Sequence, residues 1–253
     1  MNKTRVIPVL LLRGEGLVKT TKFKDPKYIG DPINSVRIFN EKEVDELVFL
    51  DIGATRECRG PNFDLLHDIA SEAFMPMAYG GGITSLDQVK RIFSLGFEKV
   101  VINTATYSDP RLINEAVAIY GSQSIVACVD LRRTLLGRYE LLSHCGNAKQ
   151  SIDLLEHVKF LEDNGVGEII VNSVDRDGTY SGYDIKLLKA VSSAVNVPVV
   201  ASGGARGVSD FVDAVYSGGA SAVAAGSLFV FVGPHKAVLI NYPKREELEK
   251  LLP

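Results

Sequence analysis

Two carboxylates stand where they could transfer protons. Asp130 ends the apolar run SIVACVD (124–130), and Asp177 lies in DRDGTYSGYD (175–184), directly after the next apolar run. An acid at the end of a buried strand can face a cavity, and two such acids can divide the roles of proton donor and proton acceptor. Asp177 also precedes Gly178, so it could instead cap a turn. Asp130 has no such neighbour, and we therefore interpret it as a catalytic acid.

Glycine pairs occur in two matched sets. Gly81 and Gly82 precede Asn103 and Thr104, and Gly203 and Gly204 precede Gly226 and Ser227. Glycine lets the backbone approach an anion closely, and a short helix that follows directs its free N–H groups at the anion. One glycine pair is weak evidence, since glycine also serves tight turns. Two equivalent sets predict a small ligand that carries phosphate at both ends.

Four charged residues stand at the beginnings of apolar runs. They are Arg5, Glu46, Lys99 and Glu168. The simplest interpretation is that these charged side chains keep the strand ends exposed to solvent. Two acids and two bases of alternating sign could also form a closed ring of ion pairs, which would gate or seal a path between the strands.

The elements that would position these residues form an α/β pattern. Eight short apolar runs alternate with segments of helical periodicity, such as SIDLLEHVKFLEDNG (151–165), and Asp31 with Pro32 is a typical helix start. Strands that are apolar at successive positions are buried on both faces, as in parallel sheets. Eight of them in 253 residues predict one (β/α)8 TIM barrel domain over residues 1–253. The runs begin at residues 6, 46, 75, 99, 124, 168, 197 and 221.

The two halves of the chain resemble each other. MPMAYGGGI (75–83) matches VPVVASGGA (197–205), and DELVFLDI (45–52) matches GEIIVNSV (167–174). A repeat of this length predicts two duplicated half-barrels, at about 1–122 and 123–253. In PVLLLRGEGLVK (8–19), however, Leu11 occupies the position that corresponds to Asp130. Leucine cannot transfer a proton, so one of the two equivalent acids is missing.

Composition excludes several classes of protein. The formal charge is −3 with basic and acidic residues spread along the chain, which argues against binding to nucleic acid. The three cysteines and four histidines show no metal-ligand spacing, so no metal and no cofactor are expected. The start MNKTRVIPVLLLRGEG lacks the features of a signal peptide, and no run suits a membrane span. We expect a soluble, cytoplasmic protein with reduced thiols and no contact with membranes.

Together these segments resemble the cyclase subunit of imidazole glycerol phosphate synthase over nearly the whole chain. The resemblance is carried by GDP (30–32), DELVFLDI (45–52), GGGI (80–83), KVVINTA (99–105), GSQSIV (121–126), GEIIVNSVDRDGT (167–179), SGYD (181–184) and ASGGA (201–205). It implies that a glutaminase docks on the N-terminal face of the barrel and that ammonia passes through the barrel to a bis-phosphate substrate.

The resemblance also assigns roles to residues. It places Arg5, Glu46, Lys99 and Glu168 at an ammonia gate, Asp130 among the catalytic acids, and Lys19 in a mobile loop after the first strand. With Gly178, Lys19 joins the two glycine sets as predicted ligand-binding residues. The family has an essential aspartate at the position of Leu11, and this departure puts cyclase activity in doubt.

A divergent branch of that family resembles the chain more closely, in LLLRGEGLVKT, KFKDPKYIGDPIN and GSLFVFVGPHKAVLINYP. Its members act with a glutaminase and a sugar amidotransferase to convert acetamido groups of surface-polysaccharide sugars into acetamidino groups. Three hypotheses follow. The chain is a synthase subunit of that amidotransferase system, or a cyclase of histidine biosynthesis, or a non-catalytic scaffold that stimulates the glutaminase.

Overall fold

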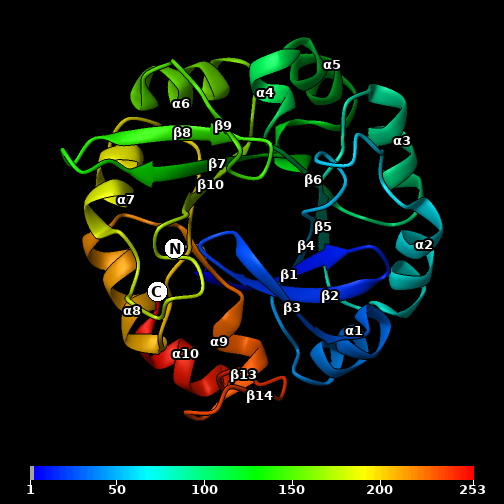
Figure 1. The fold of residues 1–253 in the computed structure, drawn as a ribbon, viewed down its shortest axis with the longest axis vertical. Coiled ribbons are helices and arrows are strands. Elements are labelled where there is room, and N and C mark those ends of the chain that lie inside the picture. The colour runs from blue at the N-terminus through cyan, green and yellow to red at the C-terminus, as the bar shows by residue number, and fades with distance from the viewer. Residues whose placement is uncertain (1–2) are drawn as a thin grey trace.

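The computed structural model describes residues 3–253 and forms a closed parallel barrel (Figure 1). Around the barrel the order is β10, β11, β12, β1, β4, β5, β6 and β7, and pairing of β10 with β7 closes it. These strands confirm the eight runs expected from the sequence and the (β/α)8 TIM-barrel class. Their bounds are β1 Arg5–Arg13, β4 Leu47–Asp51, β5 Met77–Gly80, β6 Lys99–Ile102, β7 Ile125–Arg133, β10 Glu168–Ser173, β11 Val199–Ser202 and β12 Ala222–Ala225.

Helices surround the barrel on its outer side (Figure 1). Several begin at side chains that accept hydrogen bonds from the first turn: Asp31 accepts from the N–H of Asn34 at 2.8 Å, and Asp153 caps the later helix predicted at 151–165. The helical elements are α1 Pro32–Glu41, α2 Phe63–Glu72, α3 Leu86–Ser94, α4 Ala105–Ser108, α5 Arg111–Tyr120, η1 Ser122–Ser124, α6 Leu154–Asp163, α7 Ile185–Ser192, α8 Val208–Val212, η2 Asp213–Ser217, α9 Ser227–Val230 and α10 Arg245–Leu251.

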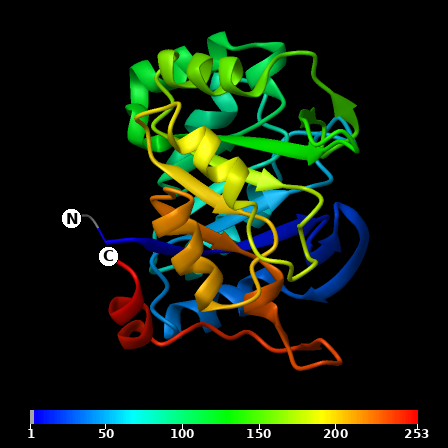
Figure 2. The same cartoon turned by 90° about the vertical axis from the view of Figure 1, so that its left-hand side faces the viewer.

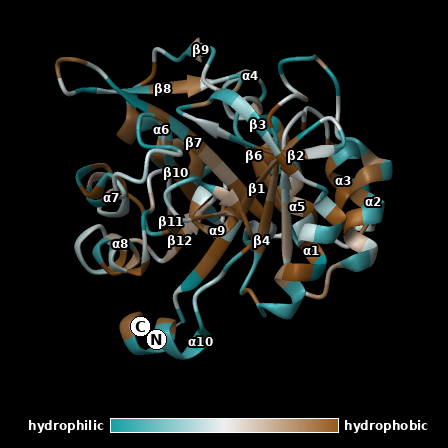
Figure 3. Cartoon of the chain, turned by 60° about the horizontal axis from the view of Figure 1, so that its bottom comes forward, coloured by the Kyte–Doolittle hydropathy of each residue, from teal (hydrophilic) through white to brown (hydrophobic). Residues whose placement is uncertain are grey.

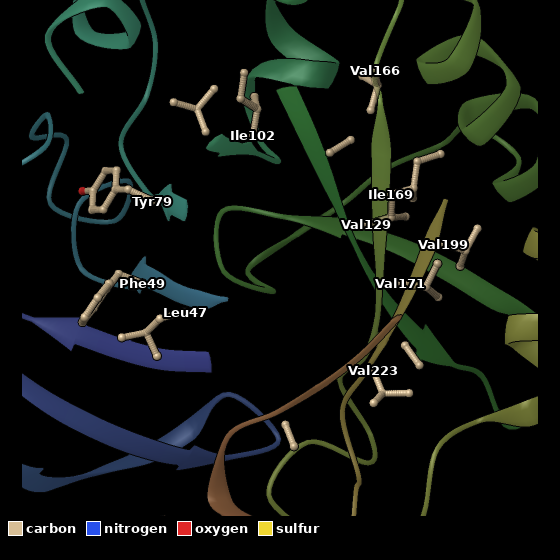
Figure 4. Close-up of a cluster of buried hydrophobic side chains, with 14 of the residues drawn as sticks. Leu47, Phe49, Tyr79, Ile102, Val129, Val166, Ile169, Val171, Val199 and Val223 are labelled. Carbon is tan, nitrogen blue, oxygen red and sulfur yellow. The ribbon is translucent and has the colours of Figure 1, made fainter. Parts of the chain in front are cut away.

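The apolar side chains form two layers because successive strand residues point to opposite faces. The outer layer fills the space between barrel and helices, and Figure 4 shows Phe49, Val129 and Val171 among its members. The inner layer lies within the barrel and is built from shorter side chains. It consists of Ile7, Val9, Val48, Ala78, Val101, Val126, Cys128, Ile170, Val200, Ala222 and Ala224, with Leu11 and Leu50 packed against it.

Three β-hairpins extend beyond the barrel strands, and the eight-run pattern did not predict them. Their additional strands are β2 Gly16–Thr21, β3 Lys24–Gly30, β8 Tyr139–Ser143, β9 Ala148–Lys149, β13 Phe231–Val232 and β14 Ala237–Val238. The resemblance placed Lys19 in a mobile loop, but Lys19 lies in β2. The reason is that β1 turns at Gly14 (φ +61°) and pairs antiparallel with β2, where Leu17 and Val18 are buried.

The two ends of the barrel differ. Residue 3 and Pro253 lie at the end where the barrel strands begin, and the hairpins lie at the opposite end (Figure 2). The backbone N–H of Thr4 donates to the carbonyl of Pro253 at 2.8 Å, which joins the two ends of the chain. Within residues 3–253, no helix has the length and apolar character needed to cross a membrane.

Candidate functional site

A cavity of about 140 Å³ opens at the C-terminal ends of the barrel strands. This is the end at which TIM barrels carry their sites. All twelve residues predicted to be catalytic or ligand-binding lie at its wall, together with Leu11. They are Lys19, Gly81, Gly82, Asn103, Thr104, Asp130, Asp177, Gly178, Gly203, Gly204, Gly226 and Ser227.

Asp130 is held by two amides. The side-chain amides of Asn103, directly after β6, and Asn172, on β10, each donate to one of its carboxylate oxygens at 2.9 Å. Asp130 is 7% exposed, and burial raises its pKa from 3.8 to about 6, although the bond from Asn172 opposes the shift. A carboxyl group with such a pKa can both take up and release a proton near neutral pH.

Lys19 and Asp177 form the other ionisable part of the cavity. Lys19 is buried and donates to the backbone carbonyl of Val9, and burial lowers its pKa to about 8 while the nearby charge of Asp177 opposes the shift. Burial raises the pKa of Asp177, which accepts from the hydroxyl of Thr20 at 3.2 Å. The Asp177 side chain therefore joins the β2–β3 hairpin to the barrel and does not cap the turn that follows it.

The glycine pairs have a structural cause of their own. A Cβ on Gly82 would lie 2.6 Å from the carbonyl oxygen of Arg59, and one on Gly203 would lie 2.6 Å from that of Ser173. Gly81 and Gly204 also have positive φ values, of +118° and +110°. Backbone packing alone thus requires glycine here, so these residues are weaker evidence for phosphate than their repetition indicated. The short helices α4 and α9, which follow Thr104 and Gly226, still begin at the cavity.

Leu11 lies at the same level of the barrel as Asp130. Both side chains line the cavity, and Leu11 and Leu50 pack against the inner apolar layer. The wall contributed by β1 is therefore apolar where the wall contributed by β7 is acidic.

The opposite end of the barrel carries a closed set of ion pairs. Arg5 pairs with both Glu46 and Glu168, and Lys99 pairs with the same two carboxylates at 2.8 and 3.4 Å. Burial alone would lower the pKa of Arg5, but the two carboxylates raise it above its ordinary value. The four residues thus lie as a ring at the N-terminal end of the inner layer, as one of the two interpretations of the sequence expected.

Several cavity residues were missed by sequence reasoning. Asn172 could have been noticed, because it is a polar residue within the buried run EIIVNSV. Thr20, Phe23 and Tyr180 carry no such signal, since only the folding of their loops brings them to the cavity. Tyr180 donates to the carbonyl of Ser227 at 3.1 Å and so covers one of the two glycine sets. Among residues 3–253 no cluster of His, Cys, Asp and Glu side chains suits a metal ion.

Fold and cavity define the class: a TIM barrel with an ionisable mouth and an ion-pair ring at the far end. A sequence model of the family described as "Histidine biosynthesis protein" matches residues 5–233. The chain is 51% identical over 249 residues to the "Putative imidazole glycerol phosphate synthase subunit hisF2" of Pseudomonas aeruginosa, covering 98% of this chain and 99% of that protein.

Further relatives agree. A protein of Leptospira interrogans with the name "Putative imidazole glycerol phosphate synthase subunit HisF" is 47% identical, with 99% of each chain covered. The "hisF3" protein of Vibrio vulnificus, with the same wording in its name, is 47% identical, with 100% of this chain and 97% of that protein covered. The chain belongs to the histidine biosynthesis protein family, as a HisF-like imidazole glycerol phosphate synthase subunit.

Proposed function

We propose that this chain is the synthase subunit of a glutamine-dependent amidotransferase and that it conducts ammonia from a glutaminase to an acetamido sugar of a surface polysaccharide. The product would carry an acetamidino group, formed by a sugar amidotransferase that works with the barrel. The observation that carries the proposal is Leu11, which stands in the cavity opposite Asp130.

A route for ammonia is supported by the three regions along the barrel axis. The ring of Arg5, Glu46, Lys99 and Glu168 lies at the N-terminal end, where the glutaminase is expected to dock. The inner layer that follows includes the small side chains of Ala78, Ala222 and Ala224. Neutral ammonia tolerates an apolar passage, whereas ions are strongly disfavoured there. On this proposal the passage would lead from the ring through the inner layer to the mouth cavity.

The mouth argues against an efficient cyclase. Cyclisation in the family the chain resembles uses two acid/base groups, and Leu11 leaves Asp130 as the one at this level of the barrel. Loss of one proton-transfer group lowers a rate by roughly 10²–10⁴-fold. A barrel that only delivers ammonia does not need the second acid, so the substitution fits that role.

A cyclase of histidine biosynthesis remains the second candidate. It is favoured by the twelve residues predicted to be catalytic or ligand-binding, which all line one cavity. On this hypothesis Asp130 and Asp177 would perform the proton transfers. The family's bis-phosphate substrate would be the phosphorylated ligand.

A turnover assay with ammonium chloride and the bis-phosphate substrate separates the candidates. We expect the wild-type chain to be at least about 100-fold slower than a family cyclase that has aspartate at this position. Leu11→Asp should recover part of the rate, and Leu11→Asn, which has a similar size without a carboxylate, is the matched control. A wild-type rate within tenfold of the ordinary cyclase would reject the amidotransferase proposal.

The ring can be tested as a gate. Lys99→Ala and Glu46→Ala should leave glutamine hydrolysis by the partner in place but reduce the share of released ammonia that reaches the acceptor, because the ring would no longer close the passage. The measurement is the ratio of acceptor product to glutamate. Lys90→Ala, on the outer helix α3, is the control. Unchanged ratios in both ring variants would contradict the gate.

A further inference from the structure

The three hairpins surround the mouth from different sides. In the order of the barrel strands, β1 and β7 lie four places apart in a closed set of eight, so they stand on opposite sides. β1 continues into the β2–β3 hairpin, and β7 pairs with β8 to form the second. The β13–β14 hairpin follows β12, the neighbour of β1. Figure 2 shows all three at the end opposite the chain termini.

Large apolar side chains are exposed on these hairpins. Leu135 and Leu136, in the turn between β7 and β8, are 107% and 86% exposed. Tyr28 on β3 is 70% exposed, and Val238 and Leu239 at β14 are 52% and 60% exposed. Figure 3 shows the apolar tip of the β8 hairpin projecting from the body of the molecule. Exposed apolar residues that are grouped are typical of contact surfaces, whereas the exposed apolar residues of a monomer are usually scattered singly.

The same hairpins are basic although the chain is acidic overall. Their exposed basic residues outnumber their exposed acids, which are Glu15 and Asp25. Within residues 3–253, none of the basic residues on the first two hairpins forms an ion pair with another part of the chain. The exposed basic residues are Arg13, Lys22, Lys24, Lys27, Arg133, Arg138, Lys149 and Lys236.

We propose that these three hairpins form the docking surface for the enzyme that consumes the ammonia, and that this enzyme presents an acidic face with apolar pockets. The inference rests on the proposed function. Ammonia that escapes into water is protonated and lost as a nucleophile, so its acceptor has to cover the mouth. Hairpins on opposite sides of the opening, such as those of β1 and β7, let one partner do so.

Two other occupants fit the chemistry less well. A second copy of the chain would bring two basic surfaces together, which costs free energy through repulsion of like charges. An anionic bilayer would attract basic and apolar hairpins, but it would close the mouth without an ammonia acceptor. An acidic protein partner would complement the basic charge, bury the apolar tips of the hairpins and cover the cavity at the same time.

The test uses the full chain with its glutaminase and the purified sugar amidotransferase. One variant, Leu135→Ser with Leu136→Ser, removes the apolar tip, and a second, Lys24→Glu with Lys27→Glu, reverses charge on the other side of the mouth. Ile38→Ser, at an exposed apolar position on the outer helix α1, is the matched control. Affinity for the amidotransferase is measured by sedimentation, and sugar product is measured with glutamine or with ammonium chloride as nitrogen source.

We expect each surface variant to weaken the affinity and the glutamine-driven rate by about tenfold or more, as for interface anchors. The ammonium-driven rate and glutamine hydrolysis should stay within about twofold of wild type, as should all rates of Ile38→Ser. The hairpin turn is fully exposed, so circular dichroism should be unchanged.

The outcomes are separable. If wild type couples glutamine to the sugar but both surface variants bind and couple normally, the docking surface is wrong and the proposed function stands. If wild type does not couple at all, both are wrong. If the chain alone self-associates and the surface variants do not, the occupant of the surface is a second copy of the chain and not the amidotransferase. If the variants lose binding to phosphatidylglycerol vesicles but keep their affinity for the amidotransferase, the occupant of the surface is a membrane.

Discussion

At the scale of single residues, the proposed function depends most on Leu11, which lines the mouth cavity. Leu11 on β1 and Asp130 on β7 both line the cavity, yet one is apolar and the other is an acid whose pKa is raised to about 6 by burial. The amides of Asn103 and Asn172 hold that acid in place. Function at this level depends on which ionisable groups the cavity retains.

Asp130 should make the stability of the protein depend on pH. Its pKa in the folded state is about 6 against an ordinary value of 3.8, so between these values the folded chain binds more protons than the unfolded chain. The contribution of Asp130 to the free energy of unfolding therefore falls as the pH rises from about 4 to about 6, by up to about 3 kcal/mol. Asp130→Asn has no carboxyl group at this position, so its free energy of unfolding should not show this decrease.

Urea unfolding at pH 4 and pH 7 measures the effect. The difference in free energy of unfolding between Asp130→Asn and wild type should shift in favour of the variant when the pH is raised from 4 to 7. Asp68→Asn, on the exposed face of α2, should show the same pH dependence as wild type. Parallel pH dependence of wild type and Asp130→Asn would show that the carboxyl is not perturbed.

At the scale of elements, the β2–β3 hairpin decides how open the mouth is. The backbone N–H of Lys22 donates to the carbonyl of Asp177 at 2.9 Å, and Thr20 bonds to the side chain of the same residue. Leu17 and Val18 anchor the base of the hairpin in the core. The hairpin thus holds Lys19 in the cavity rather than leaving it in solvent.

A substitution below the hairpin should loosen it. A Cβ on Gly178 would collide with the backbone of Thr20 and lie 3.1 Å from the Cα of Thr21, so Gly178→Ala should displace the hairpin. Trypsin cleavage after Lys22 and Lys24 should then be several times faster. Gly233→Ala is the matched control, because Gly233 has a similar positive φ of +74° but no atom within 4 Å of its Cβ position. Equal rates of trypsin cleavage in wild type, Gly178→Ala and Gly233→Ala would contradict the anchoring of the hairpin at Gly178.

At the scale of the whole molecule, the proposed division near residue 122 gives each half four barrel strands. Strands β1, β4, β5 and β6 come from the first half and β7, β10, β11 and β12 from the second. The halves meet where β1 pairs with β12 and where β6 pairs with β7. The ring of ion pairs also crosses this boundary, since Glu168 belongs to the second half and its partners Arg5 and Lys99 to the first.

Separated halves should associate with each other. A fragment of residues 123–253 exposes the edges of β7 and β12, and unpaired strand edges favour association with another chain. We expect this fragment alone to self-associate and to form a one-to-one complex when residues 1–122 are added. Sedimentation and circular dichroism would measure both steps. A fragment that stays monomeric, or that ignores its counterpart, would contradict the half-barrel proposal.

Much of this protein follows from its sequence alone. Short runs that are apolar at successive positions, alternating with helical segments, predicted the eight parallel strands, because strands buried on both faces have that pattern. The order of those strands placed Asp130, Asp177 and the glycine sets at one end and the four charges at the other. Both placements depend only on where a residue stands in its strand, so they could be predicted without coordinates.

The tertiary structure decided the rest. It showed that backbone contacts require the glycines, that Asn103 and Asn172 hold Asp130, and that Lys19 reaches the cavity from an ordered hairpin. It also placed the exposed leucines and the basic residues of three separate hairpins at one end of the barrel. These features arise between segments far apart in the chain, and local patterns of apolar and polar residues carry no information about which distant segments meet.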